Sequence, residues 1–83
     1  MDYEKINLLL GEMGIQILKS IYNGATHQES IKMLSGVSIE CIIGRLPVLI
    51  DLKLINSRKD QKNITEYKIT NEGRQFLTLI EGL

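Results

Sequence analysis

Ser35-Gly36-Val37-Ser38, near the middle of the chain, is the stretch that decides how this sequence folds. Gly36 suits the left-handed residue that ends a helix, and Ser38 can accept a free backbone N–H at the start of the next one. Val37, the apolar residue between them, can fill the core at the corner. Two helices joined by so short a turn have the outline of a helix-turn-helix.

The segments on either side of this turn have the patterns of two amphipathic helices. Before it, Thr26-His27-Gln28-Glu29 has the spacing of a capping box, which predicts a helix over residues 26–35 with Ile31 and Leu34 facing inward. After it, the pattern predicts a helix over residues 38–53. The apolar face of that helix consists of Ile39, Ile42, Leu46, Leu49 and Ile50.

Pro47 is the anomaly of the second helix. A proline inside a helix removes one backbone hydrogen bond and clashes with the carbonyl four residues earlier, here that of Ile43. We therefore expect either a kink or a helix shifted so that Pro47 falls in its first turn.

A longer amphipathic helix is predicted upstream, over residues 3–22, and Asn23-Gly24 ends it. Gly11 and Gly14 lie inside this helix and predict a break near residues 11–14. Its apolar stripe consists of Ile6, Leu10, Met13, Ile17 and Ile21, widened by Leu9, Leu18 and Tyr22.

Downstream, two extended segments and a closing helix are predicted. Residues 54–59 and 64–69 flank the polar turn Asp60-Gln61-Lys62-Asn63, as in a β-hairpin, with Tyr67 and Ile69 facing inward. Thr70 then caps a helix over residues 71–81. The apolar face of that helix consists of Phe76, Leu77, Ile80 and Leu83.

Two of these segments resemble the winged helix superfamily of bacterial and archaeal regulators. Leu46-x-x-Leu49-x-x-x-Lys53-Leu54-Ile55 is similar to the helix end that runs into the first wing strand. Tyr67-Lys68-Ile69-Thr70-x-x-Gly73-x-x-Phe76-Leu77 is similar to the junction of second wing strand and closing helix in small archaeal members. The resemblance covers roughly residues 13–81. It implies a mainly helical α+β fold: one winged helix-turn-helix domain over residues 1–83, with three helices, a two-stranded wing over residues 54–69 and a C-terminal helix.

This sequence departs from the winged helix pattern at two positions. Lys53 stands where glycine is usual, which is tolerable if its φ angle is not forced to be positive. Pro47 interrupts the helix that the resemblance implies should enter a DNA groove.

Composition limits the classes of protein that this chain can be. Its 83 residues are 43% hydrophobic and 24% charged, as in ordinary globular domains, and no apolar run approaches the roughly 18 residues needed to span a bilayer. The single cysteine cannot form an internal disulfide, and the N-terminus lacks a signal-peptide pattern, so we expect a cytoplasmic protein without a membrane partner. The formal net charge of zero argues against nucleic-acid binding through bulk charge unless the charges are segregated.

The winged helix resemblance implies three groups of DNA-contacting residues, with no cofactor. On the second helix of the pair, the recognition helix, the candidates are Ser38, Glu40, Cys41, Gly44 and Arg45. Arg45 could read guanine through a bidentate contact. On the wing they are Arg58, Lys59, Lys62 and Lys68, which could neutralise phosphates or simply protect a soluble hairpin from aggregation. On the preceding helix they are Gln28 and Lys32.

Catalytic and metal-binding patterns are not visible in this sequence. His27 stands alone, Cys41 has no neighbouring histidine, and the carboxylates have no catalytic spacing. One cysteine and one histidine cannot complete a structural zinc site within a chain. We therefore expect neither an enzyme nor a metal site, and no small-molecule pocket is evident.

These observations favour a homodimeric protein that binds duplex DNA, with or without sequence specificity, and regulates transcription. The apolar stripe that starts with Tyr3, Ile6, Leu9 and Leu10 extends beyond what a minimal core needs. The N- and C-terminal helices could simply pack on each other, but we favour a homodimer that forms through them. The alternative is a winged helix that binds another protein, for which an apolar patch around Ile43 and Val48 would speak.

Overall fold

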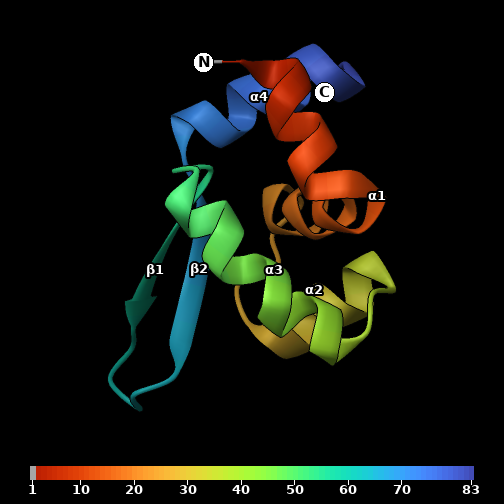
Figure 1. Ribbon diagram of the computed structural model, residues 1–83. Helices are drawn as coiled ribbons and strands as arrows, with labels where there is room; N and C mark the ends of the chain where they lie inside the picture. The colour runs from red at the N-terminus through yellow and green to blue at the C-terminus, as the bar shows by residue number, and fades with distance from the viewer. Residues whose placement is uncertain (1) are drawn as a thin grey trace.

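Four helices and one β-hairpin make up the computed structural model, which describes residues 2–83. Three helices come first: α1 (Tyr3–Tyr22), α2 (Gln28–Ser35) and α3 (Ile39–Asp51). The antiparallel strands β1 (Ile55–Lys59) and β2 (Thr65–Ile69) form the hairpin, and α4 (Asn71–Glu81) closes the chain. The hairpin projects from the helical body, and α4 lies against the N-terminal part of α1 (Figure 1). The predicted order and type of all six elements are confirmed.

The corner between α2 and α3 is built as its sequence predicts. Gly36 has φ 70° and ψ 11°, and its N–H donates to the carbonyl of Lys32 at 2.9 Å. The Ser38 hydroxyl accepts the N–H of Cys41 at 3.4 Å. Val37 is buried between them. Each of these contacts lies within three or four residues along the chain, so the local sequence sets them.

The start of α2 differs from the capping box predicted at Thr26 and Glu29. His27 is the N-cap, α2 begins at Gln28, and the Ser30 hydroxyl accepts the backbone N–H of His27 at 3.1 Å. Thr26 is held outside the helix because its carbonyl accepts the N–H of Tyr67 on β2 at 2.8 Å. Its hydroxyl contacts Nδ1 of His27 instead, at 2.8 Å.

One side of α2 faces solvent more fully than expected. Ile31 is completely buried, but Leu34 is 58% exposed, so the prediction that both face inward is wrong for Leu34. A helix of eight residues has little more than two turns, and Ile31 is its one buried residue.

The break predicted near residues 11–14 of α1 occurs at Gly11. Its φ of 64° and ψ of −176° lie in a region of backbone space that is essentially reserved for glycine. The break also changes which side chains face the core after it. Ile15 is buried and Met13 is 50% exposed, so the predicted inward place of Met13 is wrong.

The helix α3 continues through Pro47, which is its ninth residue, so the alternative with Pro47 in a first turn is wrong. Ile42, Leu46 and Leu49 are buried as predicted. The helix ends two residues before the predicted end at 53, because Lys53 has φ 62° and turns the chain toward β1. Lys53 therefore has a positive φ, which strains a residue that carries a Cβ.

The hairpin and α4 are joined through a close backbone contact. Thr70 caps α4 by accepting the N–H of Gly73 at 3.0 Å, and its hydroxyl donates to the carbonyl of Lys53 at 2.7 Å. A Cβ on Gly73 would collide with the carbonyl oxygen of Leu54. The core lies where α1, α3, β1 and α4 meet, and its largest fully buried side chains are those of Leu10, Ile17, Leu18, Ile31, Ile42, Leu49, Leu54, Ile55, Phe76 and Leu77.

Candidate nucleic-acid interface

The outward side of α3 follows from its buried side. Because Ile42, Leu46 and Leu49 face the core, the residues between them face solvent. Glu40, Gly44 and Arg45 are exposed, as is the N-cap Ser38, whereas Cys41 is half-buried. Arg45 has no ion-pair partner within residues 2–83, so its guanidinium is available to an external acceptor.

The four candidate cations of the hairpin are all exposed: Arg58, Lys59, Lys62 and Lys68. Arg58 faces Glu66 across the two strands, with its Nε 3.6 Å from the carboxylate, and its side chain is 69% exposed. An ion pair this open to water adds little stability and exchanges readily for another anion. Lys62 lies in the turn, where the Asp60 carboxylate accepts its backbone N–H at 2.8 Å, and its side chain has no ion-pair partner within residues 2–83.

The remaining candidates lie on α2. Gln28 is its half-buried first residue, and Lys32 is exposed one turn later. All three candidate groups are therefore at least partly accessible, on α2, on α3 and on the hairpin.

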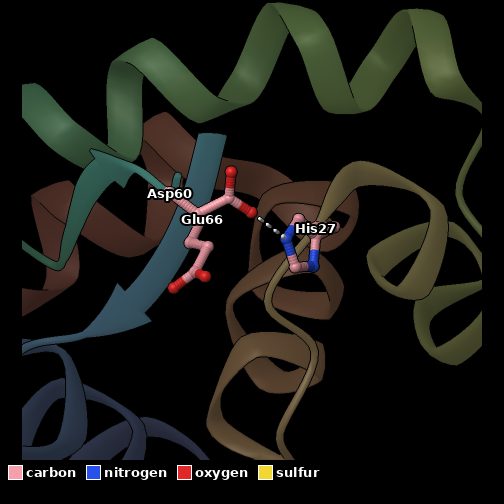
Figure 2. A group of neighbouring side chains, drawn as sticks. All are labelled: His27, Asp60 and Glu66. Atoms are coloured by element: carbon pink, nitrogen blue, oxygen red, sulfur yellow. Dashed lines mark ion pairs between the residues drawn. The ribbon is translucent and has the colours of Figure 1, made fainter. Parts of the chain in front are cut away.

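A cluster that sequence reasoning missed lies between α2 and the hairpin. Oxygen or nitrogen ligand atoms of His27, Asp60 and Glu66 lie within 4.8 Å of one another, and Nε2 of His27 is 4.0 Å from the Asp60 carboxylate (Figure 2). In the sequence, His27 stands alone, with no ligand-type residue at a metal-binding spacing. The tertiary hydrogen bond between Tyr67 on β2 and Thr26 brings His27 and the hairpin together, so no local sequence signal could have revealed the cluster.

The outer surface of α1 and α4 carries exposed apolar side chains. Leu8 is 83%, Leu9 55% and Leu79 64% exposed. A hollow at Leu79 is lined by Tyr3, Arg74, Gln75, Thr78 and Leu79.

Within residues 2–83, no single helix has both the length and the apolar character needed to cross a bilayer. Only α2 and α3 counted together, across a bend of 108°, meet that criterion.

A helix-turn-helix followed by a two-stranded wing and a closing helix is the winged helix-turn-helix fold, as predicted. Three solved structures share it. The chain resembles Bordetella bronchiseptica BpsR with a TM-score of 0.82 and 13% identity over 92% of this chain and 56% of that one. YodB from B. subtilis, in a diamide-treated form, gives a TM-score of 0.81 and 17% identity over 95% and 82% of the two chains. A predicted DNA-binding transcriptional regulator from E. coli gives a TM-score of 0.72 and 23% identity over 96% of this chain and 90% of that one.

These similarities establish the fold. No protein-family model matches the sequence, and a search of curated proteins finds no match. The BpsR structure concerns the regulation of that protein's DNA binding by 6-hydroxynicotinic acid, and the E. coli protein is described as a predicted DNA-binding transcriptional regulator. The chain spans little more than half the length of BpsR.

Proposed function

We propose that this protein binds duplex DNA and acts as a small transcriptional regulator without enzymatic activity. The observation that carries the proposal is the distribution of charge: the hairpin has four exposed cations against two partly buried carboxylates, Asp60 and Glu66, in a chain whose formal net charge is zero. In this fold the second helix of the helix-turn-helix lies in the major groove, and a wing beside it reaches the flanking backbone. The DNA binding of BpsR and the predicted DNA binding of the E. coli regulator support the same function.

On α3, Arg45 is the residue suited to read a base. Its guanidinium matches the O6 and N7 acceptors of guanine, and a bidentate contact discriminates by about 1–3 kcal/mol. Gly44, with no side chain, would let the backbone approach a base edge. Ser38 and Cys41 could contribute contacts from the first turn, and Glu40 could accept a hydrogen bond from cytosine.

On the hairpin, Arg58, Lys59, Lys62 and Lys68 would neutralise phosphates, and Gln28 and Lys32 would add backbone contacts from α2. Each phosphate that a cation neutralises contributes about −0.9 to the slope of log K against log salt concentration. Binding that relies on the wing therefore weakens steeply as salt is raised.

The direct test is fluorescence anisotropy of labelled random-sequence duplex DNA at several salt concentrations. We expect binding at low salt that is largely lost in the triple variant Arg58→Ala, Lys59→Ala, Lys62→Ala. A matched control removes three cations from α1 and α4 instead, through Lys5→Ala, Lys19→Ala and Arg74→Ala. Equal loss in both variants would refute a wing-located contact, and no binding by wild type at low salt would refute the function.

The protein acts, in this proposal, as a homodimer through α1 and α4. Ile6 and Leu10 are already buried within the protomer, so the interface would use Leu8, Leu9 and Leu79, which leave apolar surface in water. A domain of this size buries only about 60–65% of its unfolded surface, and a second copy would extend its small core. A two-fold axis would also set two copies of α3 about one helical turn apart on DNA.

The second candidate function is protein binding by the same fold. On α3, Ile43 is 53% exposed and Val48 is half-buried, and on α2 Met33 and Leu34 are 82% and 58% exposed. A partner protein with an apolar groove would bury these side chains. Absence of DNA binding at low salt would favour this alternative, and Ile43→Glu would then abolish capture of the partner.

A further inference from the structure

We propose that His27, Asp60 and Glu66 form a binding site for a divalent transition-metal ion, with Zn²⁺ the best fit, and that the bound ion strengthens the wing's hold on phosphate. These three residues are called the histidine–carboxylate triad below. The second half of this proposal rests on the proposed DNA binding, and the first half does not.

The triad has the donor set that zinc accepts. Zinc in proteins takes imidazole nitrogen and carboxylate oxygen at about 2.0–2.2 Å, and three protein ligands with water in the fourth position are common. Mg²⁺ and Ca²⁺ prefer oxygen alone, so the imidazole of His27 favours a transition metal. Ligand atoms around a tetrahedral zinc lie about 3.4 Å apart. The three groups, within 4.8 Å of one another, need to close by roughly an ångström or more, which side-chain rotation can supply.

His27 and Asp60 are already oriented toward each other (Figure 2). The Thr26 hydroxyl holds Nδ1 of His27 at 2.8 Å, which leaves Nε2 facing Asp60. Metal-bound histidines usually have such a partner on the second ring nitrogen. In Asp60, one carboxylate oxygen accepts the N–H groups of Lys62 and Ile64 at 2.8 and 3.0 Å, and the other oxygen faces His27 at 4.0 Å.

The backbone also fixes the third ligand. Tyr67 donates its N–H to the carbonyl of Thr26 at 2.8 Å, and these two residues are the immediate neighbours of Glu66 and His27. A metal would therefore join segments that are already hydrogen-bonded, at a small entropic cost. All three triad side chains are partly buried, with 39%, 28% and 22% of their surface exposed for His27, Asp60 and Glu66.

Occupancy of the triad would change the charge of the wing. Asp60 and Glu66 are the two carboxylates of the hairpin, and both would repel a phosphate. A divalent cation cancels their charge and competes with Arg58 for Glu66, whose oxygen is now 3.6 Å from the Arg58 Nε. Arg58 would then be free to contact DNA, so metal binding and DNA binding would strengthen each other.

Zinc binding is measured first, without DNA, by competition between the untagged full chain and a chromophoric chelator. We expect one Zn²⁺ per chain. Loss of a group that orients a metal ligand costs about 10- to 100-fold in affinity, and loss of a ligand costs more. Thr26→Val should therefore weaken binding about 10-fold, and His27→Ala by more than about 100-fold. Asp60→Asn keeps an oxygen that can accept the two turn N–H groups, so it tests the ligand without opening the turn.

Two controls locate the site. Glu29→Gln removes an exposed carboxylate from the first turn of α2 but outside the triad, and Cys41→Ser removes the thiol, so neither should change the affinity for zinc. Wild type without stoichiometric binding, or His27→Ala with unchanged affinity, would overturn the site.

The regulatory half is tested by DNA anisotropy with and without zinc. We expect zinc to tighten DNA binding by wild type and to leave His27→Ala and Glu66→Gln unaffected. Zinc binding at the triad with the same DNA affinity in both conditions would overturn the regulation. Zinc binding by a protein that never binds DNA would leave the metal site standing and refute the proposed function instead.

Discussion

Lys53 is the residue at which this chain departs most clearly from the winged helix sequence pattern. It takes φ 62°, where the winged helix pattern has glycine, and its side chain is exposed. A side chain with a Cβ is strained in this conformation, and glycine is not. Lys53→Gly should therefore raise the free energy of unfolding by about 1 kcal/mol, measured by urea denaturation. Lys53→Ala removes the same charge but keeps the Cβ, so an equal gain in that variant would contradict the backbone explanation.

Gly73 illustrates the opposite requirement, for space. Any Cβ at this position meets the carbonyl of Leu54, which belongs to the backbone and cannot rotate away. We expect Gly73→Ala to lower the free energy of unfolding by at least about 2 kcal/mol, because the junction of α3, β1 and α4 must shift to admit it.

Gly44→Ala is the matched control for that substitution. Gly44 is also helical, but a Cβ at this position would meet no atom within 4 Å. Alanine there should therefore stabilise the protein by about 0.5–1 kcal/mol. The same variant should weaken DNA binding if the α3 backbone approaches a base. A loss of stability in Gly44→Ala as large as that in Gly73→Ala would show that the contact with Leu54 is not what makes alanine unfavourable at position 73.

At the scale of elements, the features that could be predicted from sequence are those set by neighbours along the chain. Gly36 and Ser38 delimit α2 and α3 through contacts of three or four residues, and Thr70 caps α4 in the same way. The start of α2 could not be predicted, because the hydrogen bond from Tyr67 on β2 holds Thr26 outside the helix. The same long-range contact assembles the histidine–carboxylate triad, which is why His27 looked solitary in the sequence.

The hairpin's contribution to DNA binding is best separated by salt dependence. Lys62 lies at the turn with an exposed side chain, so Lys62→Ala should reduce the magnitude of the slope of log K against log salt by about 0.9 per protomer. The loss should be the same for different DNA sequences. Lys5→Ala removes an equal charge from α1 and should leave the slope unchanged. A slope altered equally by both substitutions would mean that total charge, and not the wing, controls binding.

At the scale of the whole molecule, the proposed homodimer explains an apolar surface that the isolated chain leaves in water. Leu8 on α1 and Leu79 on α4 are 83% and 64% exposed, on two helices that pack against each other. Sedimentation equilibrium of wild type should give the mass of two chains, and the double variant Leu8→Glu, Leu79→Glu should give the mass of one. Introduced carboxylates would be buried without partners in the dimer, which strongly disfavours association.

Met33→Glu is the control for this experiment, because Met33 is just as exposed, at 82%, but lies on α2. The Met33→Glu variant should remain dimeric. The double variant Leu8→Glu, Leu79→Glu should also lose the preference for paired over single DNA half-sites, since two linked recognition helices bind as one unit. A monomeric wild type would refute the homodimer, and dissociation caused equally by Met33→Glu would place the interface elsewhere. In that case the exposed apolar side chains of α2 and α3 would be the stronger candidates for the surface that this protein buries against a partner.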